Sequence, residues 1–229
     1  MALKDDLETQ VSTILRSQWT TREASVVPSD SSLGLGNDAA ELDATVLYAD
    51  LAESTKLVDG KSWDFAAEIY KTFLHCAAKI VRSEGGEITA YDGDRVMAVF
   101  IGDTKNTPAI RAALKLNFAC KNIIQPAINK QYTTDYVLRH TVGIDTSKLR
   151  VAKTGIRGAN DLVWVGRAAN WAAKLSAIRE ASPTWITKAV FDGAHDTGKI
   201  TNGQNMWQPR TWTQMNNTPI YCSNWTWEP

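Results

Sequence analysis

The chain has 229 residues, of which 44% are hydrophobic and 22% are charged, as is usual for a globular protein built around one large domain. The chain has 25 basic residues (Lys and Arg) and 25 acidic residues (Asp and Glu), so it has no net positive charge that would attract nucleic acid or an anionic membrane. No apolar run is long enough to cross a bilayer, and the first residues lack the pattern of a signal peptide. Cys76, Cys120 and Cys222 show no paired spacing and indicate free thiols. We therefore expect a cytoplasmic protein with neither a nucleic-acid nor a membrane partner.

The first predicted element is an amphipathic helix at residues 4–18, where apolar side chains recur at helical spacing. A stretch rich in Ser, Gly and Asp follows and predicts a linker. We therefore assign residues 1–42 to an N-terminal helix and linker, and residues 43–229 to the main domain.

The main domain is predicted to alternate between strands and helices. In chain order we expect a buried strand at 44–51, a long helix at 62–86, a hairpin around Asp92-Gly93, a second long helix at 107–128, strands at 135–155 and 161–166, an Ala-rich helix at 167–180, and closing strands at 182–192 and 205–225. The order β-α-β-β-α-β, followed by a further helix and strands, predicts an α+β fold. We expect a ferredoxin-like mixed sheet with helices covering one face.

Two acidic residues lie at the ends of predicted strands. Asp50 ends the first strand, with Tyr48 on the same face, and Asp94 stands at the start of the second hairpin strand. If these strands are neighbours, the two carboxylates can share a divalent cation, and hard oxygen ligands suit Mg²⁺ or Mn²⁺. Taken singly, Asp50 is better explained as a strand-end cap and Asp94 as part of a turn. The metal interpretation therefore depends on the strand pairing.

Polar groups that suit a nucleotide occur at two further places. The hydroxyls of Ser54 and Thr55 lie near a predicted helix start, together with backbone amides that can hold phosphate oxygens. Asn170 and Lys174 are four residues apart and share one helix face. An amide beside a cation can orient a ribose oxygen and stabilise a pentavalent phosphorus. From spacing alone, a solvated helix face is the better explanation of that pair.

Four stretches that are informative when taken together occur in this order along the chain: VLYADLAESTKL, GGEITAYDGDRVMAVF, LRHTVGIDTSKL and VGRAANWAAKL. Together they resemble the conserved blocks of class III nucleotidyl cyclases, the catalytic domain of adenylate and guanylate cyclases. The resemblance implies that residues 43–229 form the cyclase catalytic domain. It also implies that Asp50 and Asp94 bind two metal ions, with Leu51 lending a backbone carbonyl. In this family the 3′-hydroxyl of a nucleoside triphosphate attacks the α-phosphate and pyrophosphate leaves.

The resemblance also implies a head-to-tail homodimer with composite active sites. In that arrangement Asn170 and Lys174 serve the Asp pair of the partner subunit.

Some positions depart from the family pattern. Lys174 replaces the usual Arg and loses its planar fork, and Glu53 replaces a usual Gly. The residues by which adenylate cyclases read their base are Ala90 and Val163 here.

Three other residues stand in place of the lost base-reading pair: Tyr48, Arg95 and Trp164. This combination resembles the bacterial pyrimidine cyclases of the Pycsar antiphage system, which signal to a separate effector. It predicts a uridylate cyclase that makes 3′,5′-cyclic UMP from UTP with two Mn²⁺ or Mg²⁺ ions per site. An Arg at the O4 edge favours uracil over cytosine, whereas at the O2 edge it accepts both.

Alternatives to the uridylate cyclase remain open. The base can be cytosine or, less readily, adenine with the chemistry unchanged. A protein of another class, an inactive nucleotide-binding regulatory module, is also compatible with Lys174, although both metal Asp residues are present. For Arg95, the alternative is a position on the strand face opposite Asp94, where it pairs only with a surface carboxylate.

Overall fold

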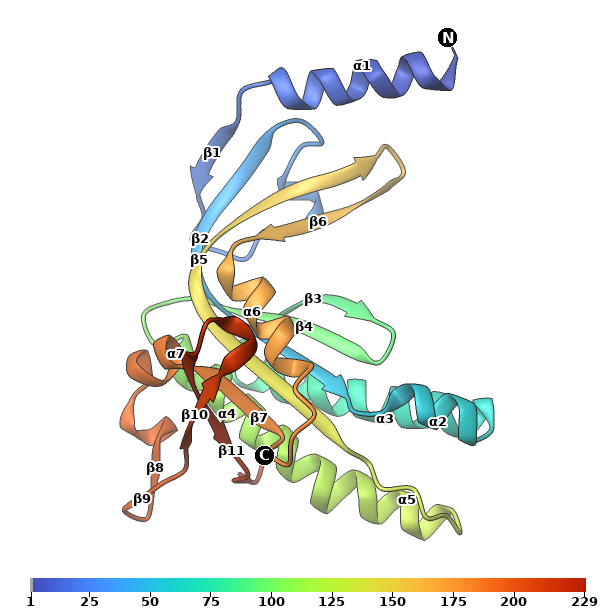
Figure 1. Cartoon of the computed structure of the whole chain (residues 1–229), viewed down its shortest axis with the longest axis vertical. Coiled ribbons are helices and arrows are strands. Elements are labelled where there is room, and N and C mark those ends of the chain that lie inside the picture. The colour runs from blue at the N-terminus through green and yellow to red at the C-terminus, as the bar shows by residue number, and fades with distance from the viewer. Residues whose placement is uncertain (1) are drawn as a thin grey trace.

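The computed structural model describes residues 2–229, which form one large mixed sheet with helices on both sides (Figure 1). The strands are β1 (Thr20–Glu23), β2 (Asp38–Leu51), β3 (Glu87–Asp92), β4 (Arg95–Phe100), β5 (His140–Ile156), β6 (Ala159–Val165), β7 (Thr184–Thr187), β8 (Ile200–Thr201), β9 (Gln204–Asn205), β10 (Gln208–Trp212) and β11 (Thr218–Ser223). The helices are α1 (Leu3–Arg16), α2 (Ser54–Gly60), α3 (Trp63–Ser83), α4 (Asn106–Ala119), α5 (Gln125–Gln131), α6 (Arg167–Ser176) and α7 (Lys188–Gly193).

The main sheet has the strand order β10-β11-β7-β5-β2-β4-β3, with β1 added beside β2 and β6 beside β5. Strand β2 is antiparallel to both β4 and β5, whereas β5 and β7 are parallel, so the sheet is mixed as predicted. The predicted hairpin is also confirmed, because β3 and β4 pair across a turn in which Gly93 has a φ of 61°. Among residues 2–229, no helix combines the length and apolar character that spanning a bilayer requires.

The two faces of β2 carry different side chains. Leu47, Ala49 and Leu51 lie in the larger core beneath α3 and α4. Val46 and Tyr48 face the other side, where α6 packs. The expectation that helices cover one face is therefore right for α3 and α4 and wrong for α6, whose small residues let it lie directly on the opposite face.

Helix α6 approaches β5 closely at Gly143. A β-carbon added to Gly143 would lie 2.2 Å from the carbonyl oxygen of Ala172 and 2.4 Å from the backbone nitrogen of Ser176. Only a glycine permits this contact. Since Gly143 is paired with Tyr48 in β2, the contact fixes α6 above the end of the sheet that carries Asp50.

Strands β2 and β5 extend beyond the body of the domain as an arm that carries β1 and β6 (Figure 1). The linker expected before residue 43 differs from the structure, because β1 pairs in parallel with the start of β2. Leu33, Ala39 and Ala40 are buried, and residue 43 falls inside β2. The Ser, Gly and Asp residues of this segment do form turns, but a few small apolar residues are enough to hold it on the sheet.

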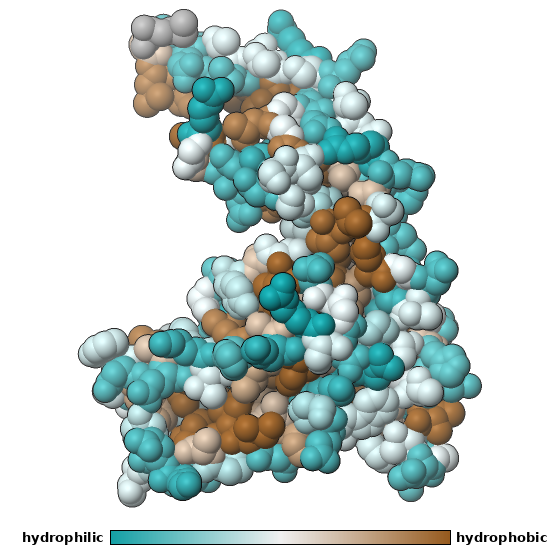
Figure 2. All heavy atoms as spheres, turned by 180° about the vertical axis from the view of Figure 1, so that it is seen from behind, coloured by the Kyte–Doolittle hydropathy of each residue, from teal (hydrophilic) through white to brown (hydrophobic). Residues whose placement is uncertain are grey.

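Helix α1 forms where the sequence predicts it, at the end of the arm. The side-chain amide of Asn37 joins it to β2 by donating to the carbonyl oxygens of Ile14 and Ser17, each at 2.8 Å. None of its residues is buried, and Leu7 and Val11 are among those that expose an apolar surface. Apolar side chains gather around α1, and the molecule is hollowed between this arm and the body (Figure 2).

Two predicted elements are interrupted. The second long helix runs through α4 and α5 but contains a π-helical turn at Cys120–Ile124. Pro126, which lacks an N–H group, follows this turn and disfavours a regular helical ladder there. The strand expected at 182–192 ends at Thr187, whose hydroxyl accepts a hydrogen bond from the backbone nitrogen of Val190 and caps α7.

The chain leaves β2 through a left-handed residue. Glu53 has φ 62° and ψ 29°, a region that L-residues with a β-carbon disfavour. This is the position at which the sequence resemblance leads us to expect Gly. The carboxylate of Glu53 pairs with Lys56 and, at 3.9 Å, with Arg139, so its side chain holds the turn in place of a glycine backbone.

We expect Glu53→Gly to be more stable than Glu53→Ala. Both variants lose the ion pairs of Glu53, but only Gly adopts the left-handed conformation without strain. The expected difference in melting temperature is about 2–4 °C in favour of Gly, measured by thermal unfolding. Equal melting temperatures for the two variants would show that the backbone at this position is not strained.

Candidate active site

The pairing of β2 with β4 brings the two predicted metal residues together. Asp50 lies opposite Arg95, and Asp94 directly precedes β4. The condition set by the sequence, that the two strands be neighbours, is therefore met. The Oδ2 atom of Asp94 is buried and has no hydrogen-bond partner among the described residues. A buried carboxylate oxygen without a partner is rare in proteins, so Asp94 is a candidate ligand for a cation.

Asp50 lies in an environment that disfavours its charge. Burial raises the pKa of Asp50, and the nearby charge of Asp94 raises it further, while the hydrogen bond from Arg179 opposes both effects. The Arg179 guanidinium lies 2.8 Å from Asp50 Oδ2. Arg179 thus provides a positive charge beside Asp50.

The carboxylate pair supplies only part of a metal coordination shell. Within residues 2–229 there is no group of three or more His, Cys, Asp or Glu side chains placed to hold a metal ion. The side chain of Leu51 is buried in the core, so only its backbone can take part. Two carboxylates suit Mg²⁺ or Mn²⁺ when phosphate oxygens of a bound nucleotide complete the shell. The donor set therefore fits a cation that arrives with its substrate.

Tyr48 and Arg95 lie next to the carboxylate pair. The Arg95 guanidinium carbon is 5.7 Å from the centre of the Tyr48 ring, and Arg95 Nη2 is 2.6 Å from Asp92 Oδ2. Arg95 therefore does pair with a surface carboxylate, but it lies beside Asp50 and Tyr48. Its Nε atom is buried without a partner in the described chain. Burial raises the pKa of the Tyr48 hydroxyl, which stays a hydrogen-bond donor at neutral pH.

Ser54 and Thr55 open α2 immediately after the Glu53 turn, as expected. Burial raises the pKa of Tyr70, on α3, and the nearby charge of Asp94 raises it further, so Tyr70 lies near this carboxylate. Sequence reasoning missed Tyr70. It sits in the long α3 helix, where nothing in the spacing distinguishes it from a packing residue.

Asn170 and Lys174 lie on the outer face of α6. The opposite face, which packs on the sheet, carries the buried residues Ala168, Ala172 and Leu175. In the described chain, no hydrogen bond or ion pair joins Asn170 or Lys174 to Asp50 or Asp94. Lys174 Nζ instead lies 3.6 Å from the Met215 sulfur. Both side chains are exposed on α6 and make no polar contact with the carboxylate pair.

Trp164 is also remote from the carboxylates of its own chain. In β5, Thr141 lies opposite Asp50 and Val151 lies opposite Trp164, a separation of ten strand positions (151 − 141). At about 3.3 Å per residue this is about 33 Å along the strand. The structure thus brings Tyr48, Asp50, Asp94 and Arg95 together and leaves Trp164, Asn170 and Lys174 on surfaces outside that cluster.

No protein-family model matches the chain. Comparison with individual proteins nevertheless places it in a family. The uridylate cyclase of Xanthomonas perforans is 54% identical over 230 residues, and that of Burkholderia cepacia is 55% identical over 229 residues. Each alignment covers 99% of both chains.

Solved structures show the same fold. A bacterial light-regulated adenylyl cyclase has a TM-score of 0.69 at 18% identity, and the match covers 81% of this chain and 53% of that one. The adenylyl cyclase CyaB from P. aeruginosa has a TM-score of 0.66 at 20% identity, covering 81% and 95%. The chain belongs to the uridylate cyclase family of nucleotidyl cyclases and has the class III cyclase fold.

Proposed function

We propose that this chain cyclises UTP to 3′,5′-cyclic UMP with release of pyrophosphate. The observation that carries the proposal is the pair Asp50 and Asp94 on neighbouring strands, with one buried carboxylate oxygen unpaired. In the reaction, the 3′-hydroxyl oxygen bonds to the α-phosphorus and loses its proton. The bond from the α-phosphorus to the bridging oxygen breaks, and pyrophosphate leaves.

Asp50, Asp94 and the backbone carbonyl of Leu51 would hold two Mn²⁺ or Mg²⁺ ions. Such ions, when bound, polarise the α-phosphate and favour loss of the 3′-hydroxyl proton. Ser54 and Thr55, at the start of α2, would contact triphosphate oxygens.

Selection of the base would fall to Tyr48 and Arg95. Asp92 and the Tyr48 ring hold the Arg95 guanidinium, so its remaining N–H groups are directed donors. A donor at the O4 edge favours uracil and opposes the amino group of cytosine. The half-buried Tyr48 would narrow the pocket against a purine and stack on the smaller ring. Of the alternative substrates, CTP is the one that this arrangement disfavours least.

Three residues would complete the site that contains the carboxylate pair of a partner subunit: Asn170, Lys174 and Trp164. The support is their position: Trp164 lies far along β5 and β6 from Asp50 of the same chain, and Asn170 and Lys174 lie on the exposed face of α6. A head-to-tail homodimer would form two such shared sites. Asn170 would orient the ribose, and Lys174 would stabilise charge on the phosphorus.

The biological role follows from the family resemblance rather than from the site. We propose that cyclic UMP made by this chain is a second messenger in antiphage defence, read by a separate effector. The cysteines of the described chain are all free thiols, which supports a cytoplasmic location.

Mixing two inactive variants tests the shared site. Asp50→Ala and Asn170→Ala are each expected to abolish turnover as homodimers. After subunit exchange, half of the dimers are mixed and each has one intact site, so activity should return to roughly a quarter of the wild-type value. The measurement is cyclic UMP formation from UTP and Mn²⁺.

The matched control mixes Asp50→Ala with Asp94→Ala. Both changes damage the same half of a shared site, so this mixture should stay inactive. Recovery in the control, or no recovery in the test mixture after demonstrated exchange, contradicts a site shared between subunits.

Competition of UTP against CTP and ATP tests the base-reading residues. Tyr48→Phe and Arg95→Ala are expected to lower the preference for UTP by about tenfold or more, because a base-specific hydrogen bond is worth roughly 1–3 kcal/mol. Wild-type protein should prefer UTP. An unchanged order of preference in both variants would show that the base is read elsewhere, with Trp164 the next residue to change.

A further inference from the structure

The N-terminal turn of α6 is tied to the sheet by an ion pair with a buried acid. Arg167, the first residue of the helix, donates to the Asp145 carboxylate of β5 from Nε, at 3.0 Å, and from Nη2, at 3.3 Å. Asp145 is fully buried, whereas 42% of the Arg167 side chain is exposed. A planar two-point contact of this kind defines the orientation of the guanidinium as well as its distance.

Three elements meet at the Asp145 carboxylate. Besides the guanidinium from α6, it accepts a hydrogen bond of 2.6 Å from the hydroxyl of Thr187, the last residue of β7. The Arg167 Nη2 atom also donates to the carbonyl oxygen of Thr146, at 2.7 Å. The pair therefore joins the start of α6 to both β5 and β7.

A second group of contacts holds the same part of the helix. The backbone nitrogen of Ala168 donates to the Ser147 hydroxyl at 3.0 Å, so a side chain of β5 satisfies one of the free N–H groups at the helix start. The Arg167 guanidinium carbon lies 4.8 Å from the centre of the Trp171 ring, one turn further along α6. Arg167 is thus held both by β5 and by its own helix.

Apolar packing does little to fix the rotation of this turn. In the first half of α6, the buried residues that pack on the sheet are Ala168, Ala169 and Ala172. The strand beneath them has no side chain at Gly143. Small side chains bury little apolar area and form shallow ridges that do not interlock. The first large buried side chain of the helix is Leu175, so the polar contacts determine how the first turn is oriented.

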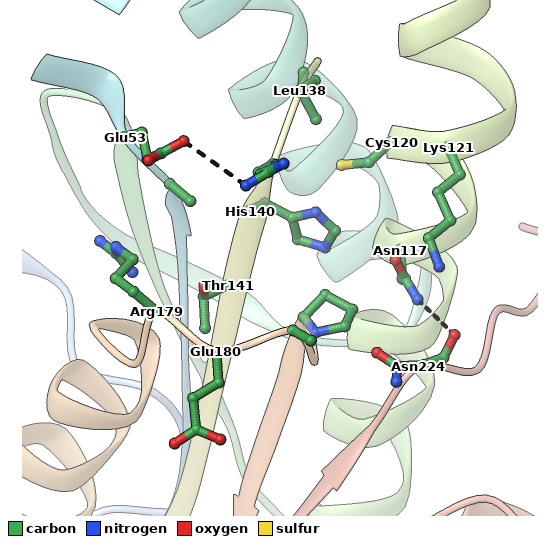
Figure 3. A pocket seen from close by; sticks show the side chains of 14 residues that line it. Glu53, Asn117, Cys120, Lys121, Leu138, His140, Thr141, Arg179, Glu180 and Asn224 are labelled. Atoms are coloured by element: carbon green, nitrogen blue, oxygen red, sulfur yellow. Dashed lines mark hydrogen bonds and ion pairs between the residues drawn. The ribbon is translucent and has the colours of Figure 1, made fainter. Parts of the chain in front are cut away.

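The C-terminal end of α6 has a weaker attachment. The segment that follows it carries Arg179 and Glu180 and borders a cavity of about 570 Å³ (Figure 3). The Thr141 hydroxyl donates to the carbonyl oxygen of Ile178 at 3.2 Å, and Arg179 pairs with Asp50. In the proposed function, cations compete with Arg179 for that carboxylate. The attachment at Arg167 does not depend on Asp50 and persists when cations bind.

Asn170 lies within the turn that the Arg167 contacts hold. It follows Arg167 by three residues and precedes Lys174 by four, so the three lie along one stripe of the helix. The Asn170 side chain is exposed, and no hydrogen bond from it is found among residues 2–229. The rotation of α6 therefore determines where the amide of Asn170 points.

We propose that the Asp145–Arg167 pair positions Asn170 for catalysis by setting the rotation of α6, and that neither member of the pair contacts the substrate. The inference rests on the proposed function, in which Asn170 orients the ribose. A buried carboxylate is costly to desolvate, and such pairs commonly add little net stability. The benefit of this one is a defined position for Asn170, because a displacement of about 1 Å at a catalytic group costs about a hundredfold in rate.

Removal of the guanidinium tests the positioning role. Arg167→Met keeps an unbranched side chain but loses the contacts to β5, so kcat for cyclic UMP formation should fall by about tenfold or more, with a smaller change in KM. Arg167→Lys should restore part of the loss. The matched control is Arg111→Met on α4, across the sheet, which removes a similarly exposed guanidinium from the buried carboxylate of Glu84. Its kcat should stay within about twofold of wild type.

Subunit mixing separates positioning from a general structural role. If Arg167 acts through α6, Arg167→Met damages the same half of a shared site as Asn170→Ala. Mixed with Asp50→Ala, it should therefore recover roughly a quarter of the wild-type activity, as Asn170→Ala should. Mixed with Asn170→Ala, it should recover nothing. A general loss of structure would damage both halves and prevent recovery in either mixture.

Hydrogen exchange of the free protein gives a readout that does not depend on turnover. The backbone amides of α6 should exchange about tenfold faster in Arg167→Met than in wild type, and those of β2 and β4 at unchanged rates. Mass spectrometry of peptides from these elements measures the difference.

The outcomes distinguish this inference from the proposed function. An unchanged kcat in Arg167→Met overturns the inference, and so does an equal acceleration of exchange in α6, β2 and β4. No recovery with Asp50→Ala, where Asn170→Ala does recover, overturns it and leaves the proposed function intact. Failure of both mixtures after demonstrated subunit exchange overturns the shared site, and the positioning role with it.

Discussion

Two carboxylates on neighbouring strands are the constraint around which this end of the molecule is organised. Burial and the charge of Asp94 both disfavour an ionised Asp50, so the folded chain needs a positive charge at that point. Arg179 supplies it, at 2.8 Å from Asp50 Oδ2. Within residues 2–229, the buried Oδ2 atom of Asp94 has no such partner. In the proposed function, cations bind at this pair and compete with Arg179 for Asp50.

The packing of α6 determines which side chains are available to a second subunit. Because Gly143 lets the helix lie directly on β5, one side of α6 is occupied by its own sheet. Asn170 and Lys174 are left on the other side, directed outward. The long arm of β2, β5 and β6 similarly carries Trp164 far from the carboxylates of the same chain. One chain thus carries the two proposed halves of a catalytic site at separate places.

Local patterns predicted much of this from sequence. The Asp-Gly turn, the alternation along β2 and the helical face of Asn170 and Lys174 each depend on a few adjacent residues, and the structure has them all. The features that the sequence did not predict depend on contacts between residues far apart in the chain. Arg179 meets Asp50 across 129 residues, and no spacing indicates that pair. The turn-rich composition of the β1 segment predicts a linker, whereas its pairing with β2 depends on tertiary packing.

The most direct test of the account is where manganese binds. Crystals grown with Mn²⁺ and 3′-deoxy-UTP, which cannot cyclise, should give two anomalous peaks about 2.1 Å from oxygens of Asp50 and Asp94. Arg179 should no longer bond Asp50, and Asn170 of the partner subunit should contact the ribose. Manganese bound away from both carboxylates, or a ribose contacted by Asn170 of the same chain, would contradict the account.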